Sequence, residues 1–167
     1  MDAILERASV RQFSEEPVSE DQIRVLLRAG MAAPSAGNQQ PWEFYVVFDE
    51  ATRQSLAECS PYARPAEFAP CVIVACTRES ALRFPPCVPQ DMGACLENIL
   101  LEAVEQDLGG VWLGIAPEED RMDKVAKVLQ LPEDVRAFAL VAVGHPLKEP
   151  NPRGAERYDE ERIHWVM

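Results

Sequence analysis

Two short stretches of the sequence carry side chains that could bind a charged or an aromatic ligand. The first contains Arg7, Ser9 and Arg11, which supply two guanidinium groups and one hydroxyl. The guanidinium is planar and forms bidentate, charge-assisted hydrogen bonds, so these side chains could converge on one dianion such as a phosphate. A solvated basic turn is the alternative interpretation of the same three residues.

The second stretch covers residues 34–42, with the sequence PSAGNQQPW, in which two prolines bracket a small, amide-rich turn. The amides of Asn38, Gln39 and Gln40 offer paired hydrogen-bond donors and acceptors, and Ser35 adds a hydroxyl. Groups of this kind can recognise the edge of a heteroaromatic ring. They can equally satisfy the backbone groups of the turn itself, which is the alternative interpretation.

The second stretch lies between a predicted helix and a predicted strand. Ser19, followed by Gln22 three residues later, is typical of a helix start, and apolar residues then recur at helical spacing as far as residue 33. Residues 43–48 are expected to form a strand. Loops in such a position hold functional groups on a rigid scaffold. A short helix is also predicted for residues 2–7, and Ser9 and Arg11 of the first stretch follow directly after it.

The rest of the chain alternates between predicted helices and strands. Apolar runs predict strands at residues 70–76, 111–115 and 135–144, and the first of these should be buried on both faces. Helices are predicted at 49–59, 90–108 and 122–129, with loops at 60–69 and 83–89. Helices interleaved with strands predict an α/β-type domain of about four strands.

Two segments have apolar surfaces whose partner the sequence does not reveal. The helix predicted at residues 90–108 has an apolar face too wide for a solvent-exposed helix, so it packs either in its own core or against a partner. Residues 145–167 form an extended, proline-containing tail. Its last five residues, 163–167, are predicted to form a strand that needs an external surface on which to dock.

The length and the amino terminus restrict the class of protein. With 167 residues the chain is expected to be a single domain, residues 1–167, that buries a substantial core. No apolar run is long enough to cross a bilayer. The first residues carry an early acidic side chain and no long apolar segment, so a signal peptide is not predicted and a cytoplasmic location is expected.

The formal charge of −12 argues against two classes of partner. Binding to nucleic acid is driven mainly by Lys and Arg at phosphates, and an acidic protein is also repelled from anionic membranes. The chain has five cysteines and no CxxC motif, and neither His145 nor His164 stands at a metal-ligand spacing. Reduced thiols and no structural metal are therefore expected.

Four stretches of the sequence, in this order, resemble motifs of the nitroreductase family of FMN-dependent NAD(P)H oxidoreductases. They are RASVRQF at residues 7–13, PSAGNQQPW at 34–42, GGVWLG at 109–114, and a tail with ERYD at 156–159 and HW at 164–165. The chain is short for that family, so it resembles the compact, single-domain members. The resemblance implies an α+β fold with a mixed central sheet of about four strands flanked by helices.

The resemblance also implies a homodimer in which each subunit donates its C-terminal strand to its partner and two FMN sites lie at the interface. Ten positions of this sequence match the family's cofactor-binding residues. The FMN phosphate and ribityl chain are expected at Arg7, Ser9 and Arg11. The ring and ribityl chain of the opposite subunit's flavin are expected at Pro34, Ser35, Asn38 and Gln40. The backbone near flavin N5 is expected from Leu113 and Gly114, and a further contact to phosphate from Arg157.

One position departs from the family pattern. Ala155 stands where some members have a lysine beside the arginine at position 157. Either Arg153 compensates for the missing cation, or phosphate binding is weaker.

The activity implied by the resemblance is transfer of reducing equivalents from NAD(P)H to an electron-poor acceptor by a ping-pong mechanism. Nitroaromatics, quinones and activated alkenes are candidate acceptors. The flavin carries out the hydride chemistry, so no side-chain nucleophile is required and no catalytic residue is assigned. Two other hypotheses stay open: a flavin-binding storage, sensing or flavin-modifying protein without NAD(P)H turnover, and a non-enzymatic interaction module.

Overall fold

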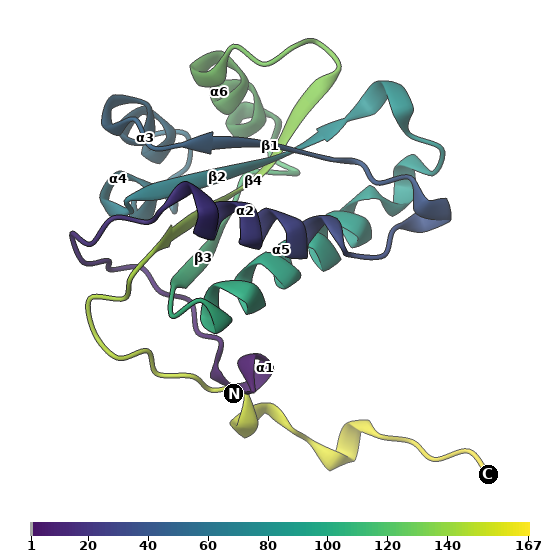
Figure 1. The fold of residues 1–167 in the computed structure, drawn as a ribbon. Coiled ribbons are helices and arrows are strands. Elements are labelled where there is room, and N and C mark those ends of the chain that lie inside the picture. The colour runs from purple at the N-terminus through teal and green to yellow at the C-terminus, as the bar shows by residue number, and fades with distance from the viewer. Residues whose placement is uncertain (1) are drawn as a thin grey trace.

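The computed structural model describes residues 2–167 and contains one sheet covered by helices (Figure 1). The strands are β1 (Trp42–Val47), β2 (Cys71–Arg78), β3 (Gly109–Gly114) and β4 (Val135–Gly144). The helices are α1 (Ala3–Glu6), α2 (Glu20–Met31), α3 (Glu50–Ala57), α4 (Pro65–Phe68), α5 (Val88–Glu105) and α6 (Glu119–Leu129). The α+β class implied by the resemblance is thereby confirmed.

The sheet has the strand order β1-β2-β4-β3, and every pair of neighbouring strands is antiparallel. The expectation of a mixed sheet is therefore wrong for these four strands. The connections β1–β2 and β3–β4 bring the chain back in the opposite direction, whereas β2 and β3, joined through α5, run in the same direction but have β4 between them, so no two neighbouring strands are parallel. Among the described residues, the one parallel pairing is an isolated bridge between Ser9 and Gly110, beside β3.

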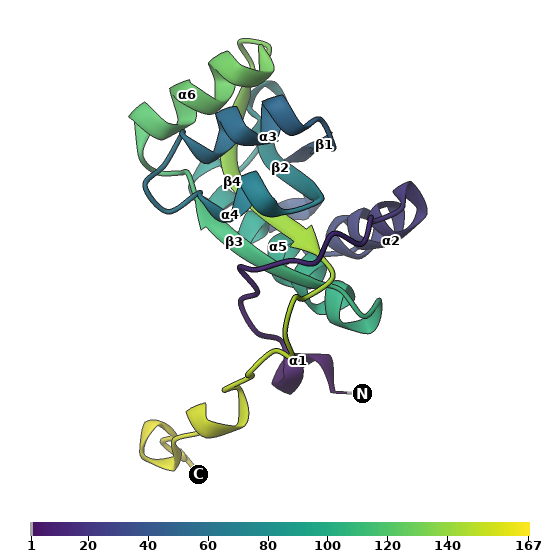
Figure 2. The ribbon, with the colours of Figure 1, turned by 90° about the vertical axis from the view of Figure 1, so that its left-hand side faces the viewer.

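The sheet is covered on both faces, because alternate side chains of its central strands point in opposite directions (Figures 1 and 2). On one face, Val72 and Val74 of β2 belong to a buried cluster with residues of α3, α4 and α6. On the other face, Ile73 belongs to a cluster with residues of α2 and α5. This arrangement explains the unbroken apolar run of β2 and confirms that the strand is buried on both faces.

Helix α2 begins where the sequence predicted and packs against α5. The capping box predicted at Ser19 and Gln22 is present. Gly30 faces α5 so closely that an added Cβ would lie 2.8 Å from Cγ1 of Ile99. Helix α5 begins at Val88, earlier than predicted, because Pro89 lies in its first turn, where the missing N–H would have no helical partner.

The segment after α1 is held between the start of β3 and the start of the tail. The backbone N–H of Val10 donates to the carbonyl of Gly110 at 3.1 Å. A short distance along, the N–H of Ser14 donates to the carbonyl of His145 at 2.9 Å, and the N–H of Leu147 donates to that of Gln12 at 3.0 Å. The segment that follows α1 is thus hydrogen-bonded to the start of the C-terminal tail, beside β3.

Two predicted features of secondary structure are corrected. Residues 60–69 are not only loop, because Pro65 begins the short helix α4. Residues 163–167 form no strand, and Trp165 and Val166 are exposed in a tail that extends away from the sheet (Figure 1). A strand needs a neighbouring edge with which to pair, and the tail meets none within its own chain. Within residues 2–167, no helix has the length and apolar character needed to span a membrane.

Candidate functional site

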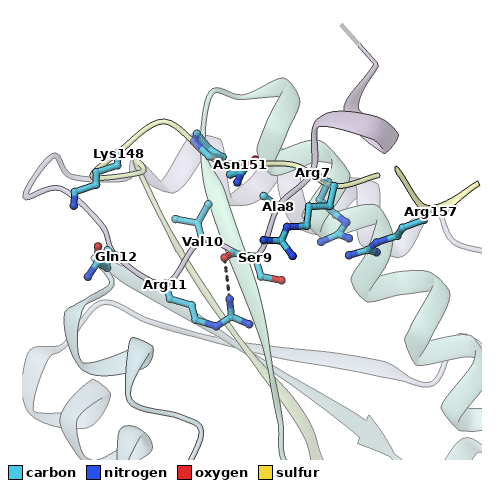
Figure 3. A pocket seen from close by; sticks show the side chains of 11 residues that line it. Arg7, Ala8, Ser9, Val10, Arg11, Gln12, Lys148, Asn151 and Arg157 are labelled. Carbon is cyan, nitrogen blue, oxygen red and sulfur yellow. Dashed lines mark hydrogen bonds between the residues drawn. The ribbon is translucent and has the colours of Figure 1, made fainter. Parts of the chain in front are cut away.

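A cavity of about 600 Å³ lies where the two ends of the chain meet (Figure 3). It is lined by Arg7, Ala8, Ser9, Val10, Arg11, Gln12, Lys148, Pro150, Asn151, Arg153 and Arg157. Five of the 16 Lys and Arg residues of this acidic chain therefore surround one cavity, and none of its described lining residues is acidic. Such a concentration of positive charge favours an anionic ligand.

The cations of this cavity come from two separate segments. Arg7 and Arg11 are placed by the segment fastened to β3, and Arg157 is placed by the tail. Arg7 and Arg157 both line the cavity, and the guanidinium of Arg11 donates from Nη1 to the carbonyl of Ser9 at 3.1 Å (Figure 3). Glu97 of α5 lies 3.1 Å from Nε of Arg7 and balances part of the charge. Arg7 stays among the lining residues of the cavity despite this ion pair.

Four residues predicted to contact phosphate are thus brought together, namely Arg7, Ser9, Arg11 and Arg157. Arg153 also lines the cavity, and its compensation for Ala155 stays a prediction. Lys148 and Asn151 were missed. They lie in a proline-rich segment without periodicity, so nothing in the sequence indicated which way their side chains would point.

Glycine at position 109 is needed to hold the basic segment in place. A Cβ at Gly109 would lie 2.5 Å from Cγ2 of Val10, which is closer than real Cβ contacts come. The glycine therefore lets Val10 pack against β3. Val10 stands in the sequence between Ser9 and Arg11, which both line the cavity. Gly109 thus allows one segment of the chain to approach another closely.

The amide-rich loop, residues 34–41, does not line this cavity in its own chain. It contains a short 3-10 turn, Ala36–Asn38, and the hydroxyl of Ser35 accepts a hydrogen bond from the N–H of Gln40 at 3.0 Å. Gly37, Asn38 and Gln40 all have positive φ angles, between 47° and 55°. Non-glycine residues in this conformation cost on the order of 1–3 kcal/mol each and persist only where the surroundings hold them.

The side chains of the loop divide into two groups. Gln39 is partly buried, and its side chain is fully hydrogen-bonded within the chain, although to residues 83, 84 and 91 rather than to the turn itself. Asn38 and Gln40 are exposed, and neither side chain makes a hydrogen bond to any other described residue. Their amide groups are therefore free to bind something outside the chain.

Leu113 and Gly114 lie on β3, which is an edge strand of the sheet. The Leu113 side chain is buried in the core, so only its backbone can reach a ligand. A Cβ at Gly114 would meet no atom within 4 Å, which leaves open space above this position. The carbonyl of Gly114 accepts a long hydrogen bond of 3.4 Å from Nη1 of Arg121.

Among residues 2–167, no group of three or more His, Cys, Asp or Glu side chains is placed to hold a metal ion. The polar groups of the site are instead cations, amides and backbone. The fold and this site together define an α+β protein with an arginine-rich cavity and a separate amide loop.

Comparison with known proteins identifies the class more closely. The family model described as the Nitroreductase family matches residues 4–63 and 61–145, and the chain belongs to this family. A protein of Archaeoglobus fulgidus named as a candidate NADH dehydrogenase/NAD(P)H nitroreductase is 37% identical over 163 residues. The match covers 96% of this chain and 94% of that protein. The resemblance drawn from the four motifs is thereby confirmed.

Solved structures agree over most of the chain. The crystal structure of a candidate NADH oxidase from Clostridium acetobutylicum has a TM-score of 0.93 and 41% identity, with 98% of each chain covered. That of a candidate nitroreductase from Desulfovibrio desulfuricans, in complex with FMN, has a TM-score of 0.78 and 31% identity. It covers 89% of this chain and 87% of that one.

Proposed function

We propose that the protein is an FMN-dependent oxidoreductase that passes reducing equivalents from NAD(P)H to an electron-poor acceptor. The observation that carries the proposal is the cavity lined by Arg7, Arg11, Arg153, Arg157 and Lys148 without an acidic neighbour among its described lining residues. The phosphate of FMN is a small dianion, and arginine is the side chain best suited to it. Family membership and the FMN complex of a relative support the same cofactor.

The residues of the cavity divide the work of binding. Arg7, Arg11 and Arg157 donate hydrogen bonds to phosphate oxygens, and the hydroxyl of Ser9 adds a neutral donor. Arg153 supplies the charge that is absent at position 155. Because Glu97 holds Arg7 from behind, the guanidinium keeps its direction before the ligand arrives, which reduces the entropy lost on binding.

The amide loop serves the flavin of a second copy of the chain. This part of the proposal is supported by the exposed, unbonded amides of Asn38 and Gln40 and by their absence from the cavity of their own chain. The exposed tail end at Trp165 docks on the partner, where a sheet edge allows it to form the expected strand. Backbone groups of Leu113 and Gly114 lie beside the flavin ring in the open space over β3.

Bound FMN supplies the hydride chemistry, while the protein binds, orients and shields the reactants. NAD(P)H and the acceptor use the same open face in turn, so each must leave before the other enters. Nitroaromatics, quinones and activated alkenes are the proposed acceptors. Initial rates against NADH at several quinone concentrations should give parallel double-reciprocal lines. Intersecting lines would mean that donor and acceptor bind together and that the proposed shared face is wrong.

The cofactor itself is tested by purification. The protein should be yellow, and heat should release a flavin that co-elutes with FMN on a column. Recovery of FAD, or of no flavin after reconstitution with FMN, would contradict the proposal. Anaerobic mixing with NADH or NADPH should then bleach the flavin absorbance. A bound flavin that neither nicotinamide bleaches would instead indicate a storage, sensing or flavin-modifying role, which the charge of −12 keeps open because NAD(P)H is an anion.

A further inference from the structure

Asp91 is the one charged side chain among the buried described residues, with 5% of its surface exposed. It lies in the first turn of α5, and its carboxylate accepts two hydrogen bonds from the amide loop. The backbone N–H of Ala36 donates to Oδ1 at 2.9 Å, and Nε2 of Gln39 donates to Oδ2 at 2.6 Å. Burying a carboxylate is unfavourable, and even a satisfied buried charge is weak evidence for a role in stability alone.

Gln39 extends the contact to a third segment of the chain. Its Oε1 accepts from the N–H of Arg83 at 3.1 Å and from that of Phe84 at 2.9 Å. Its Nε2 also donates to the carbonyl of Phe84 at 3.2 Å. The Asp91–Gln39 pair therefore connects the start of α5, the amide loop and residues 83–84. All three segments are fixed relative to one another by two side chains.

The loop needs such external support because of its backbone. Gly37, Asn38 and Gln40 have positive φ angles, and a Cβ at Gly37 would lie 2.4 Å from Cε2 of Phe84. A backbone in this unfavourable conformation is not stable by itself, so contacts with the surrounding residues must maintain it. The bonds from Asp91 hold the positions just before and just after Gly37 and Asn38, where the backbone is most unusual.

We infer that Asp91 is a positioning residue that, through Ala36 and Gln39, sets the loop conformation in which Asn38 and Gln40 are presented to the flavin. The inference rests on the proposed function, since it takes the flavin to be the ligand of the loop. Asp91 does not touch the cofactor in this assignment. It determines where the amides point, in the way that a second layer of hydrogen bonds fixes the groups that bind a ligand.

The test exchanges the two partners. In Asp91→Asn, an amide N–H₂ faces Nε2 of Gln39, so two donors oppose each other. In Gln39→Glu, two carboxylates oppose each other. In the double variant Gln39→Glu/Asp91→Asn, the new amide donates to the new carboxylate, and the pair keeps one negative charge. Each single variant should weaken FMN binding about ten-fold or more in a fluorescence titration. The double variant should recover part of that loss, because the new pair is complementary but the carboxylate at position 39 no longer donates to the carbonyl of Phe84.

A control separates positioning from stability. Leu56→Ala opens the core on the opposite face of the sheet, far from the loop, and lowers stability without touching the Asp91–Gln39 pair. It should leave FMN affinity and the visible circular dichroism of bound flavin unchanged, whereas the single variants should alter both. The inference is overturned if the single variants lose stability as Leu56→Ala does but bind FMN as tightly as the wild type.

A second measurement needs no flavin. In the cofactor-free protein, the backbone amide of Ala36 should exchange its hydrogen about ten-fold faster in Asp91→Ala than in the wild type, because its acceptor is gone. Unchanged exchange would overturn the role of Asp91 in holding the loop. If wild-type protein binds no FMN, the proposed function fails by itself, and the exchange result still decides whether Asp91 controls the loop.

Discussion

Arg7 and Arg157 line a single cavity, although one precedes the first strand and the other follows the last (Figure 3). Two guanidinium groups brought together repel each other, and an anion between them removes that repulsion. Their convergence therefore makes the cavity respond to phosphate in ways that can be measured.

Removal of Arg11 should weaken FMN binding far more than removal of Arg24. Arg11 lines the cavity, whereas Arg24 lies on the outside of α2, where it pairs with Glu20 in solvent. Loss of a charged hydrogen bond to phosphate costs on the order of 1.5–3 kcal/mol, or roughly ten- to a hundred-fold in affinity. Flavin titrations of Arg11→Ala and Arg24→Ala give the comparison, and equal, small effects would refute the assignment of Arg11.

FMN should stabilise the cofactor-free protein much more than riboflavin, which has the same ring but no phosphate. At a free ligand concentration about 100 times Kd, binding contributes about 2.7 kcal/mol to stability. For a chain of this length that corresponds to a rise in Tm of roughly 5–11 °C. Thermal melts with equal concentrations of the two flavins measure the difference. A riboflavin shift as large as that of FMN would show that the cations do not bind phosphate.

Two helical glycines should respond in opposite ways to alanine. Gly93 of α5 has no atom within 4 Å of an added Cβ, so Gly93→Ala should raise the free energy of unfolding by roughly 0.5–1 kcal/mol. In Gly30→Ala the methyl group would collide with Ile99, which is fully buried and cannot move aside. Overpacking of this kind costs about 1–3 kcal/mol, which exceeds the helical gain. Urea denaturation of both variants provides the test.

Stability should fall as the pH rises above 9. Burial raises the pKa of Cys71, Cys76 and Cys95 to about 12 from an ordinary value of 9.0. Between these values the unfolded chain releases thiol protons that the folded chain retains, so unfolding becomes easier with pH. Each thiol contributes about 1.4 kcal/mol per pH unit within that window. Urea midpoints at pH 8 and pH 10 show the loss, and Cys76→Ala should make it smaller.

Two inactive variants should restore activity when they share a dimer. Arg11→Glu damages the phosphate end of a site, and Asn38→Asp damages the loop that serves the other subunit. If both variants are unfolded, mixed and refolded, about half of the dimers are mixed, and about a quarter of all sites are intact by random assembly. Flavin binding and activity should recover to that fraction. A mixture as inactive as its parents would place both residues in one subunit's site.

Local signals in the sequence identified most of the elements. The capping residues at Ser19 and Gln22, and the apolar run at 70–76, predicted α2 and β2 because the causes of these elements lie within a few residues. The prediction of a mixed sheet was wrong for these four strands, because strand pairing depends on segments far apart in the chain. The strand predicted at 163–167 is absent from the single chain, and its pairing with a second copy stays a prediction.

The candidate site was likewise predicted where local sequence determines it and missed where distant segments do. Arg7, Ser9, Arg11 and Arg157 were found through motifs, since residue type and spacing carry that information. Asp91 was missed because an acidic residue in the first turn of a helix usually faces solvent. Its partners are 52 and 55 residues away in the sequence, and nothing near it indicated burial. The family and the fold class were confirmed, whereas the assignment of individual residues to FMN stays a prediction.

The cavity is built from a part of the chain that is made early and a part that is made late. Arg7, Ser9 and Arg11 leave the ribosome first, but Gly110, which holds that segment, and Arg157, which completes the cation cluster, follow much later. A nascent chain therefore lacks a phosphate site throughout most of its synthesis. Under the proposed function, FMN can therefore bind only after nearly the whole chain has been made.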